Sequence, residues 1–225
     1  MKQIFSIIVS LIFMFNINFA NAETPTLIKS ETKELILEIK YPQGFAKESM
    51  NEEIKHLVEQ LKKANMPEVD ANLPADIPGK NGLYIDYKIV YQNERALSLL
   101  FTVSAYTRGA AHPNNSLETL NFIDGKKISY AELFKKDTDY LNPIATICKN
   151  ALMKKDFSND ELIIEGTKPA IENYQNWNFS KEGLVITFKP YQVAAYVYGA
   201  QDVLIPKAKL NALMLPEITK AIWGN

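Results

Sequence analysis

The sequence predicts an α+β fold, in which helices pack on one face of a largely antiparallel sheet. Two observations predict this class. About seven short segments alternate apolar and polar residues, as half-buried strands do, and most are joined by short turns. Three or so segments with helical apolar spacing are inserted between them, which is typical of α+β folds. We expect two α+β subdomains, residues 23–105 and 106–225, that share the sheet.

The N-terminal elements begin with a strand and a helix. In residues 27–42, apolar side chains occupy alternate positions, which predicts one half-buried strand. Apolar residues at helical spacing follow a capping box formed by Ser49 and Glu52, so a helix should run to about residue 64. The proline-rich stretch 65–82 then predicts a loop or a linker.

Three further strands should follow this loop. Residues 82–91 and 96–107 alternate strongly across a short polar turn, which predicts an antiparallel hairpin. Residues 116–123 predict a third strand, and the pair Asp124-Gly125 is a strong turn signal at its end.

Two helices are expected next. Ser129 and Glu132 form a second capping box, which predicts a short helix. Asn142 and Pro143 are typical of an N-cap followed by the first helical residue. In that second helix, Cys148 falls on the apolar face and should lie in the core as a small hydrophobe.

The C-terminal part should return to strands. Residues 176–180 and 183–188 predict a hairpin, and residues 202–206 predict one more short strand. The chain should then end in a short helix that reaches Trp223.

The first 22 residues have the order of a secretory signal peptide. Lys2 precedes a long apolar run, which closes on the small-residue site Ala20-Asn21-Ala22. We therefore expect cleavage after Ala22, no membrane span afterwards, and a periplasmic or secreted location. With one cysteine in the sequence, no disulfide within the chain is expected, and we expect a monomer.

The small net charge of the chain argues against polyanionic partners held by charge alone. The formal net charge is −1, which is too small to hold nucleic acid or an anionic membrane by electrostatics.

His112 is the first candidate for function, because it is one of two histidines and lies in the unusual stretch RGAAHPNN, residues 108–115. A histidine there could act as a general base or ligate a metal. We favour a conformational or recognition role, because Gly109 and Pro113 shape the backbone on either side. His56 shares a helix face with acidic residues, but its lysine neighbours indicate a solvated face.

The second candidate is the tyrosine-rich stretch PYQVAAYVYGAQ, residues 190–201. Tyrosines on a loop offer broad apolar faces with a polar tip, which suits recognition of proteins and sugars. The alternative is that one or two of these tyrosines plug the end of the sheet. We expect both loops to follow strands and to converge in one ligand-binding patch, formed by Arg108, His112, Asn114, Tyr191, Tyr196 and Gln201. We expect no catalytic residue, metal or cofactor.

These two stretches also carry a resemblance to a known family. The run from Gly109 through the Asp124-Gly125 turn, and the later run Pro190-Tyr191-x-Val193-Ala194, resemble the secreted domain of RsiV-type anti-sigma factors, which sense lysozyme. A similar domain accompanies some peptidoglycan deacetylases. The further matching positions are His112, Asn114, Leu133, Phe134, Gly199 and Pro206.

The resemblance covers roughly residues 105–210, and residues 28–105 resemble, more loosely, the domain that usually precedes it. Ala110 and Ala195 depart from the family pattern, which has glycine and proline there. The resemblance implies an α+β fold and a binding role in the cell envelope. Because the sequence shows no catalytic constellation, we expect a non-enzymatic module that binds a protein, with lysozyme as one candidate, or a cell-wall glycan. The alternative is a cell-wall hydrolase or deacetylase-associated enzyme that uses His112.

Overall fold

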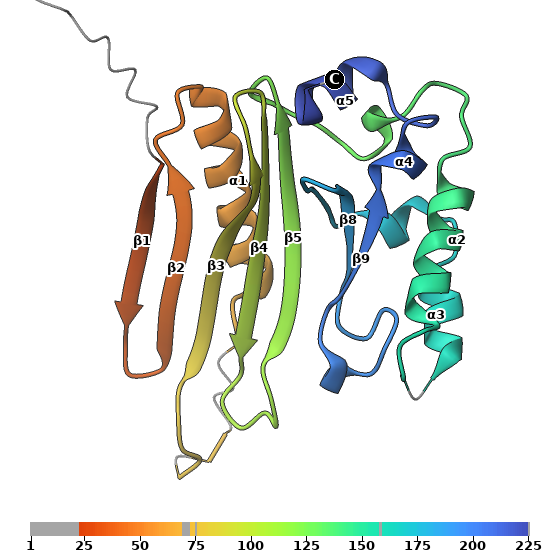
Figure 1. Cartoon of the computed structure of the whole chain (residues 1–225). Coiled ribbons are helices and arrows are strands. Elements are labelled where there is room, and N and C mark those ends of the chain that lie inside the picture. The colour runs from red at the N-terminus through yellow and green to blue at the C-terminus, as the bar shows by residue number, and fades with distance from the viewer. Residues whose placement is uncertain (1–22, 69–72, 75, 158, 225) are drawn as a thin grey trace, which may run out of the picture.

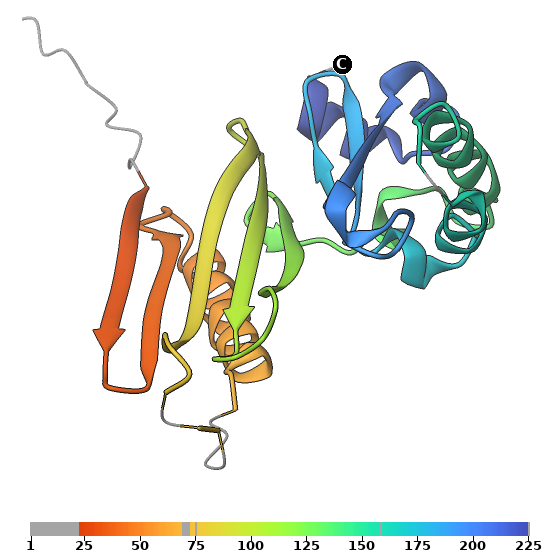
Figure 2. The same cartoon turned by 90° about the horizontal axis from the view of Figure 1, so that it is seen from below.

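A computed structural model describes residues 23–224, apart from 69–72, 75 and 158 (Figure 1). The predicted signal peptide, residues 1–22, lies outside the described residues. The α+β class is confirmed, and most strand pairs are antiparallel. The expected shared sheet is instead two sheets, one of six strands and one of three, which lie side by side (Figures 1 and 2).

The six-stranded sheet has the order β1-β2-β3-β4-β5-β6. Its elements, with the helix that covers it, are β1 (Thr24–Glu31), β2 (Leu35–Gln43), α1 (Glu48–Asn65), β3 (Asn81–Gln92), β4 (Ala96–Tyr106), β5 (Asn114–Ile123) and β6 (Lys126–Lys127). The β2–β3 pair is parallel, because the chain crosses over through α1. The expected boundary between residues 105 and 106 falls inside β4, which pairs with β5 in this one sheet.

The predicted single strand over residues 27–42 is wrong, because the chain turns back at Thr32 to form the β1–β2 hairpin. Thr32 closes the turn, since its Oγ1 accepts the backbone N–H of Leu35 at 3.0 Å. Pro42 lies within β2, opposite Pro25. The pairing of β2 with β3 stops at Ile39. Pro42 lies beyond this point, so its missing N–H removes no hydrogen bond from the β2–β3 pair.

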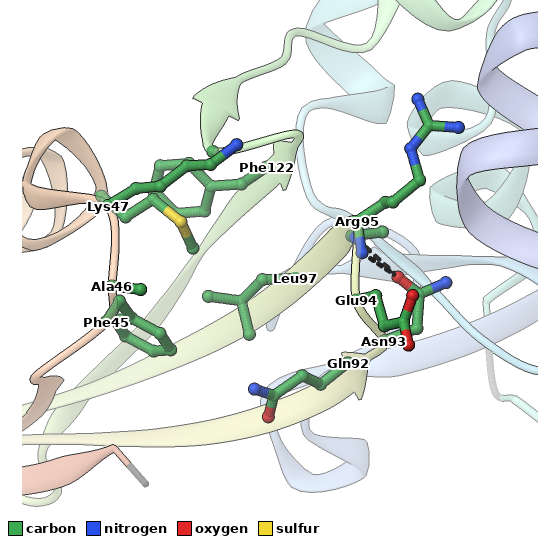
Figure 3. A pocket seen from close by; sticks show the side chains of 12 residues that line it. Phe45, Ala46, Lys47, Gln92, Asn93, Glu94, Arg95, Leu97 and Phe122 are labelled. Atoms are coloured by element: carbon green, nitrogen blue, oxygen red, sulfur yellow. Dashed lines mark hydrogen bonds between the residues drawn. The ribbon is translucent and has the colours of Figure 1, made fainter. Parts of the chain in front are cut away.

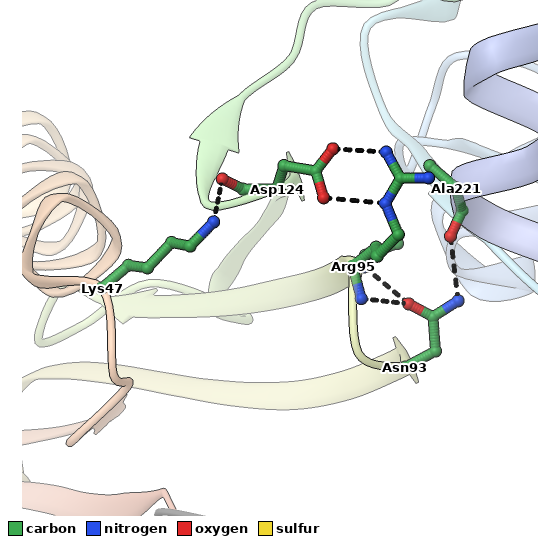
Figure 4. Close-up of polar contacts among 6 residues, drawn as sticks. Lys47, Asn93, Arg95, Asp124 and Ala221 are labelled. Atoms are coloured by element: carbon green, nitrogen blue, oxygen red, sulfur yellow. Dashed lines mark hydrogen bonds and ion pairs between the residues drawn. The ribbon is translucent and has the colours of Figure 1, made fainter.

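The start of α1 differs from the prediction, since the capping box does not form. The residue before the helix is Lys47, which gives no side-chain cap. Ser49 donates instead to the carbonyl of Gly125 at 3.1 Å, and the Lys47 ammonium binds the carbonyl of Asp124 (Figure 4). These two contacts tie the start of α1 to the β5–β6 turn, but they do not cap the helix, because both side chains donate to carbonyls.

Helix α1 supplies the core of the six-stranded sheet. Ile54 and Val58 on its inner face are buried against Ile39, Leu83 and neighbouring apolar side chains of the sheet. Each such side chain contributes roughly 1.5–3 kcal/mol when it is fully removed from water. The helix covers one face, so the polar side chains that alternate along β3 and β4 lie on the opposite face.

The three-stranded sheet, of order β7-β8-β9, has a separate core under helices α2 and α3. Its elements are α2 (Leu141–Leu152), α3 (Asp160–Gly166), β7 (Trp177–Phe179), β8 (Gly183–Phe188), β9 (Gln201–Pro206), α4 (Lys207–Leu210) and α5 (Pro216–Trp223). Short 3-10 turns occupy Ala131–Leu133, Ile171–Tyr174 and Tyr196–Tyr198.

Two predicted helix starts have different outcomes. Helix α2 begins at Leu141, and the carboxylate of Asp139 accepts the backbone N–H of Asn142 at 3.2 Å, so Asn142 is not the N-cap. Of the two hydrogen bonds in the second capping box, the one to the glutamate is confirmed: Glu132 accepts the backbone N–H of Ser129 at 2.7 Å.

The predicted burial of Cys148 is confirmed. Its surroundings raise the pKa of the thiol to about 12, because burial disfavours the thiolate. The thiolate is the reactive form, so we expect the native protein to resist thiol reagents at pH 8 and to react at once when denatured. Measurement of 2-nitro-5-thiobenzoate release with and without urea checks this. Rapid release from the native protein would contradict the buried position.

Two buried tyrosines in this core give an opposed pair of predictions. The hydroxyl of Tyr130 has no hydrogen-bond partner among the described residues, whereas Tyr174 donates to the carbonyl of Thr167 at 2.7 Å. Tyr130→Phe should therefore leave stability unchanged or raise it, while Tyr174→Phe should lower it by about 1–2 kcal/mol. Urea denaturation of both variants tests this, and equal losses would be inconsistent with the unpaired Tyr130 hydroxyl.

The two sheets are joined by buried polar side chains, which we call the junction network: Ser98, Asn121 and Asn178. The amide of Asn178 donates to Ser98 Oγ at 2.9 Å and to the carbonyl of Leu99 at 3.0 Å. Asn121 accepts from Ser98 and donates to the carbonyl of Trp177 at 2.8 Å. Because buried polar groups are costly when unpaired, this network fixes how β7 packs against β4 and β5.

A second set of contacts joins the six-stranded sheet to the C-terminal helix. It lies at the end of the six-stranded sheet opposite the β4–β5 loop (Figure 4). Arg95 holds the carboxylate of Asp124 through two hydrogen bonds of 2.9 and 2.6 Å, which lowers the pKa of that carboxyl. Asn93 donates to the carbonyls of Ala221 and Ile222 in α5, at 3.1 and 2.8 Å. The β3–β4 turn thus contacts both the β5–β6 turn and the C-terminal helix.

Candidate functional site

The two loops singled out in the sequence meet at the lower end of both sheets in Figure 1, so their predicted convergence is confirmed. Tyr196 joins them. Its hydroxyl donates to the carbonyl of Pro113 at 2.9 Å and accepts from Asn115 Nδ2 at 2.7 Å. The imidazole of His112 stacks on the Tyr196 ring, with 4.3 Å between centroids and 23° between planes.

Tyr191 also packs against Tyr196. Its ring centroid lies 5.3 Å from that of Tyr196, and the planes are tilted by 30°. We call His112, Tyr191 and Tyr196 the aromatic cluster. Tyr191 is 58% exposed and has a φ of 68°, in the left-handed region that costs a residue with a side chain roughly 1–2 kcal/mol. Such strain is frequent at binding and active sites.

The sequence around Tyr191 explains how the loop is held. Val193 and Ala194 are buried and anchor it in the C-terminal core. The side chain of Gln192 donates to the carbonyls of Gly166 and Asn173, at 3.2 and 3.0 Å. Three consecutive residues therefore anchor the loop, while the ring of Tyr191 just before them is exposed.

Two further features fix the position of this loop. Lys189 forms a 2.7 Å ion pair with Glu118 of β5, which ties the start of the loop to the six-stranded sheet. Gly166 permits close approach, because a Cβ at that position would lie 2.1 Å from the carbonyl oxygen of Gln192. A larger residue at 166 would push the loop away from α3.

A cavity of about 300 Å³ adjoins the aromatic cluster, and we call it the sheet cavity. It lies on the face of β3, β4 and β5 opposite α1, with loop residues as its wall. Asn115 belongs to both sites, because it lines the cavity while its amide contacts Tyr196. The lining residues are Tyr84, Asp86, Thr102, Val103, Ser104, Asn115, Ser116, Leu117, Pro190, Gly199 and Ala200.

The other three predicted residues lie outside the aromatic cluster. The backbone N–H of Arg108 donates to Asn81 Oδ1 at 2.8 Å, and its guanidinium lies 4.0 Å from Glu34. Gln201 accepts from Lys155 Nζ at 2.8 Å and donates to a backbone carbonyl of its own loop. Asn114 is exposed at the start of β5. A ligand-binding role for the six predicted residues stays a prediction.

Two residues of the site were missed by the sequence analysis. Asn115, rather than Asn114, contacts Tyr196, and strand alternation counted back from Leu117 could have separated the two asparagines. Tyr84 gave no signal, because an aromatic residue at an outward strand position is common.

The surroundings of His112 do not form a catalytic arrangement in the part of the chain that the structure describes. The hydrogen bond found for its ring joins Nδ1 to the carbonyl of Pro113, at 2.9 Å, so this nitrogen acts as a donor. Glu118, the nearest acidic residue along the chain, is paired with Lys189. Among residues 23–224 that are described, no group of three His, Cys, Asp or Glu side chains is placed to hold a metal ion.

A second cavity, of about 280 Å³, lies at the other end of the six-stranded sheet (Figure 3). Phe45, Leu97 and Phe122 give it an apolar floor, and the cationic side chains of Lys47 and Arg95 stand at its rim. Both cations are already bound to Asp124. The lining of this second cavity contains none of the six residues predicted to bind ligand.

Comparison with known proteins relates the chain to two protein families. Two family models match it. Residues 28–115 match the family described as deacetylase PdaC, and residues 131–208 match a protein family of unknown function, DUF3298. The first match includes His112 near its end, and the second includes Tyr191 and Tyr196.

Curated relatives extend this picture. The chain is 29% identical over 200 residues to the peptidoglycan-N-acetylmuramic acid deacetylase PdaC of Bacillus subtilis, which covers 87% of the chain and 42% of that protein. It is 25% identical over 109 residues to the immunogenic protein MPT64 of Mycobacterium tuberculosis, covering 47% of each. The chain therefore spans less than half the length of these curated relatives.

Two solved structures share the fold. A DUF3298 family member from Bacteroides fragilis superposes with a TM-score of 0.61 at 15% identity, covering 90% of this chain and 98% of its own. A DUF3298 family protein from Pseudomonas aeruginosa gives a TM-score of 0.62 at 13% identity, covering 87% and 94%. Among the described residues, no helix has the length and apolar character needed to cross a membrane.

Proposed function

We propose that this protein is a non-enzymatic binding module of the cell envelope, whose ligand is a cell-wall glycan bound at the aromatic cluster. The observation that carries the proposal is the aromatic cluster, in which exposed His112 and exposed Tyr191 both pack against the half-buried ring of Tyr196. Aromatic faces pack against the C–H faces of sugar rings, and tyrosine hydroxyls add polar contacts at the edge. Because the loops are held by hydrogen bonds and buried anchors, little ordering entropy is lost on binding.

The similarity to PdaC supports a role at the cell wall. That relative is named for acting on N-acetylmuramic acid in peptidoglycan, and this chain resembles 42% of its length. A periplasmic or secreted location, reached through the signal peptide predicted in residues 1–22, agrees with such a ligand. We propose that the protein acts there as a monomer.

Two other functions are weighed against this one. The resemblance to RsiV-type domains makes a lysozyme-like protein the second candidate partner, and an exposed tyrosine cluster also suits protein recognition. A hydrolase that uses His112 as base receives less support, because the hydrogen bond found for its ring goes to a backbone carbonyl.

Tyr191 gives the first test, because its exposed ring contacts the cluster while its backbone is strained. Tyr191→Gly should keep or raise stability, because glycine adopts a φ of 68° readily. It should weaken binding of chitotetraose, a β-1,4-linked N-acetylglucosamine tetramer, at least tenfold. Calorimetric titration of the whole exported chain measures this, with thermal unfolding as the check on stability.

Tyr198→Ala is the matched control, since Tyr198 lies on the same loop but packs against Phe157 instead of the cluster. It should leave chitotetraose affinity within twofold of the unaltered protein. Parallel titrations use solubilised peptidoglycan fragments and a lysozyme. Binding to lysozyme alone would replace the glycan with a protein partner, and no binding to any of the three would overturn the proposal.

A further inference from the structure

The sheet cavity has the chemistry of a second site for a neutral, hydroxyl-rich ligand. Thr102 and Ser104 project from the face of β4 opposite α1, because the residues between them pack into the core under that helix. These two side chains place two hydroxyls in the lining, whereas Ser116 pairs with the core residue Val103 and its side chain lies on the other face of the sheet. No hydrogen bond from Thr102 or Ser104 side chains is found within the described ranges, so both hydroxyls remain available to a ligand.

An aromatic ring accompanies these hydroxyls. Tyr84 is 41% exposed and rests over Gly82, where an added Cβ would lie 2.8 Å from the ring. Asp86 is the charged residue among the lining residues, and Lys40 stands 3.7 Å from its carboxylate. The lining therefore offers ring stacking and hydrogen bonds without a strong net charge, which fits an uncharged sugar better than a phosphate or a basic peptide.

The cavity is continuous with the aromatic cluster. Asn115 lines it and donates to the Tyr196 hydroxyl at 2.7 Å, and Pro190 lines it and directly precedes Tyr191. Its volume of about 300 Å³ is at the lower end of the range of roughly 300–1,000 Å³ for small-ligand sites. The next unit of a chain-like ligand bound on the cluster would enter this space.

We infer that the sheet cavity is a second sugar subsite, so that the ligand is a glycan chain of at least two units bound across both sheets. This inference rests on the proposed function. One unit stacks on the exposed ring of Tyr191, and the next lies over Tyr84 with its hydroxyls bonded to Thr102 and Ser104. Affinity should therefore rise with chain length.

The test compares N-acetylglucosamine with chitotetraose on the whole exported protein. The unaltered protein should bind the tetramer at least tenfold more tightly than the monosaccharide. The double variant Thr102→Val, Ser104→Ala removes two hydroxyls and keeps the shape of the cavity. Its affinity for the tetramer should therefore fall five- to tenfold, while its affinity for the monosaccharide should stay the same. Gly82→Ala, which displaces the Tyr84 ring from the same site, should have the same effect and serves if the double variant does not fold.

The outcomes separate this inference from the proposed function. Equal tetramer affinity in the variants and the unaltered protein would overturn the second subsite while leaving the cluster as the binding site. The same conclusion follows if the unaltered protein binds monosaccharide and tetramer equally. If neither sugar binds the unaltered protein, the proposed glycan binding itself is contradicted.

Discussion

Asn178→Leu is expected to lower the free energy of unfolding by about 2–4 kcal/mol, because it removes two buried hydrogen bonds and leaves Ser98 Oγ and the Leu99 carbonyl each with one partner fewer. Asn178 is 1% exposed, and its amide donates to Ser98 Oγ and the carbonyl of Leu99. Leucine has a similar size, so the effect reports polarity rather than a cavity. The loss should be concentrated at the junction of the two sheets.

Urea denaturation, followed by circular dichroism and tryptophan fluorescence, measures this effect. Asn114→Leu is the matched control, because Asn114 is exposed at the start of β5, and surface changes usually stay within about 0.5 kcal/mol. Equal stability of the two variants would show that the junction network does not hold the sheets together.

Gly166→Ala should destabilise the protein by roughly 1–3 kcal/mol through overpacking. Helix propensity favours alanine over glycine, so the expected sign is opposite to the local preference. The reason is contact, since the new Cβ would lie 2.1 Å from the Gln192 carbonyl oxygen and 2.8 Å from Val193 Cγ1. The loop must move, and chitotetraose binding should weaken with it.

Thermal unfolding and sugar titration of the same sample check both parts. Glu161→Ala, an exposed change in the same helix, should alter neither quantity. A Gly166→Ala protein as stable as the unaltered one would mean that α3 and the loop do not pack as closely as described.

Local patterns predicted much of the fold, and the failures have physical causes. The hairpins of β3 with β4 and of β7 with β8 were predicted, because alternation and short turns are local signals. The turn at Thr32 was missed, because it contains no glycine, proline or asparagine to mark it. The capping box at Ser49 failed, because its hydroxyl bonds to Gly125, far along the chain.

The division into two sheets could not be predicted, because strand pairing between distant segments leaves no local pattern. The site was predicted only in part, because contacts between distant segments also leave no local pattern. Residue types identified both loops, and the contact of Tyr196 with Pro113 across 83 residues bears out their meeting. Arg108 lies outside the cluster, because its backbone N–H bonds to Asn81 and its guanidinium lies 4.0 Å from Glu34, both distant in sequence.

The two histidines allow the most direct test of glycan binding at the aromatic cluster. His112 stacks on Tyr196, whereas His56 is exposed on α1. In a ¹H–¹³C NMR spectrum, the His112 ring signals therefore report on the cluster, and the His56 ring signals serve as an internal reference. Titration with chitotetraose should shift the His112 ring signals in a saturable way and leave those of His56 unchanged. Unmoved His112 signals at millimolar sugar, or equal movement of both histidines, would contradict binding at the cluster.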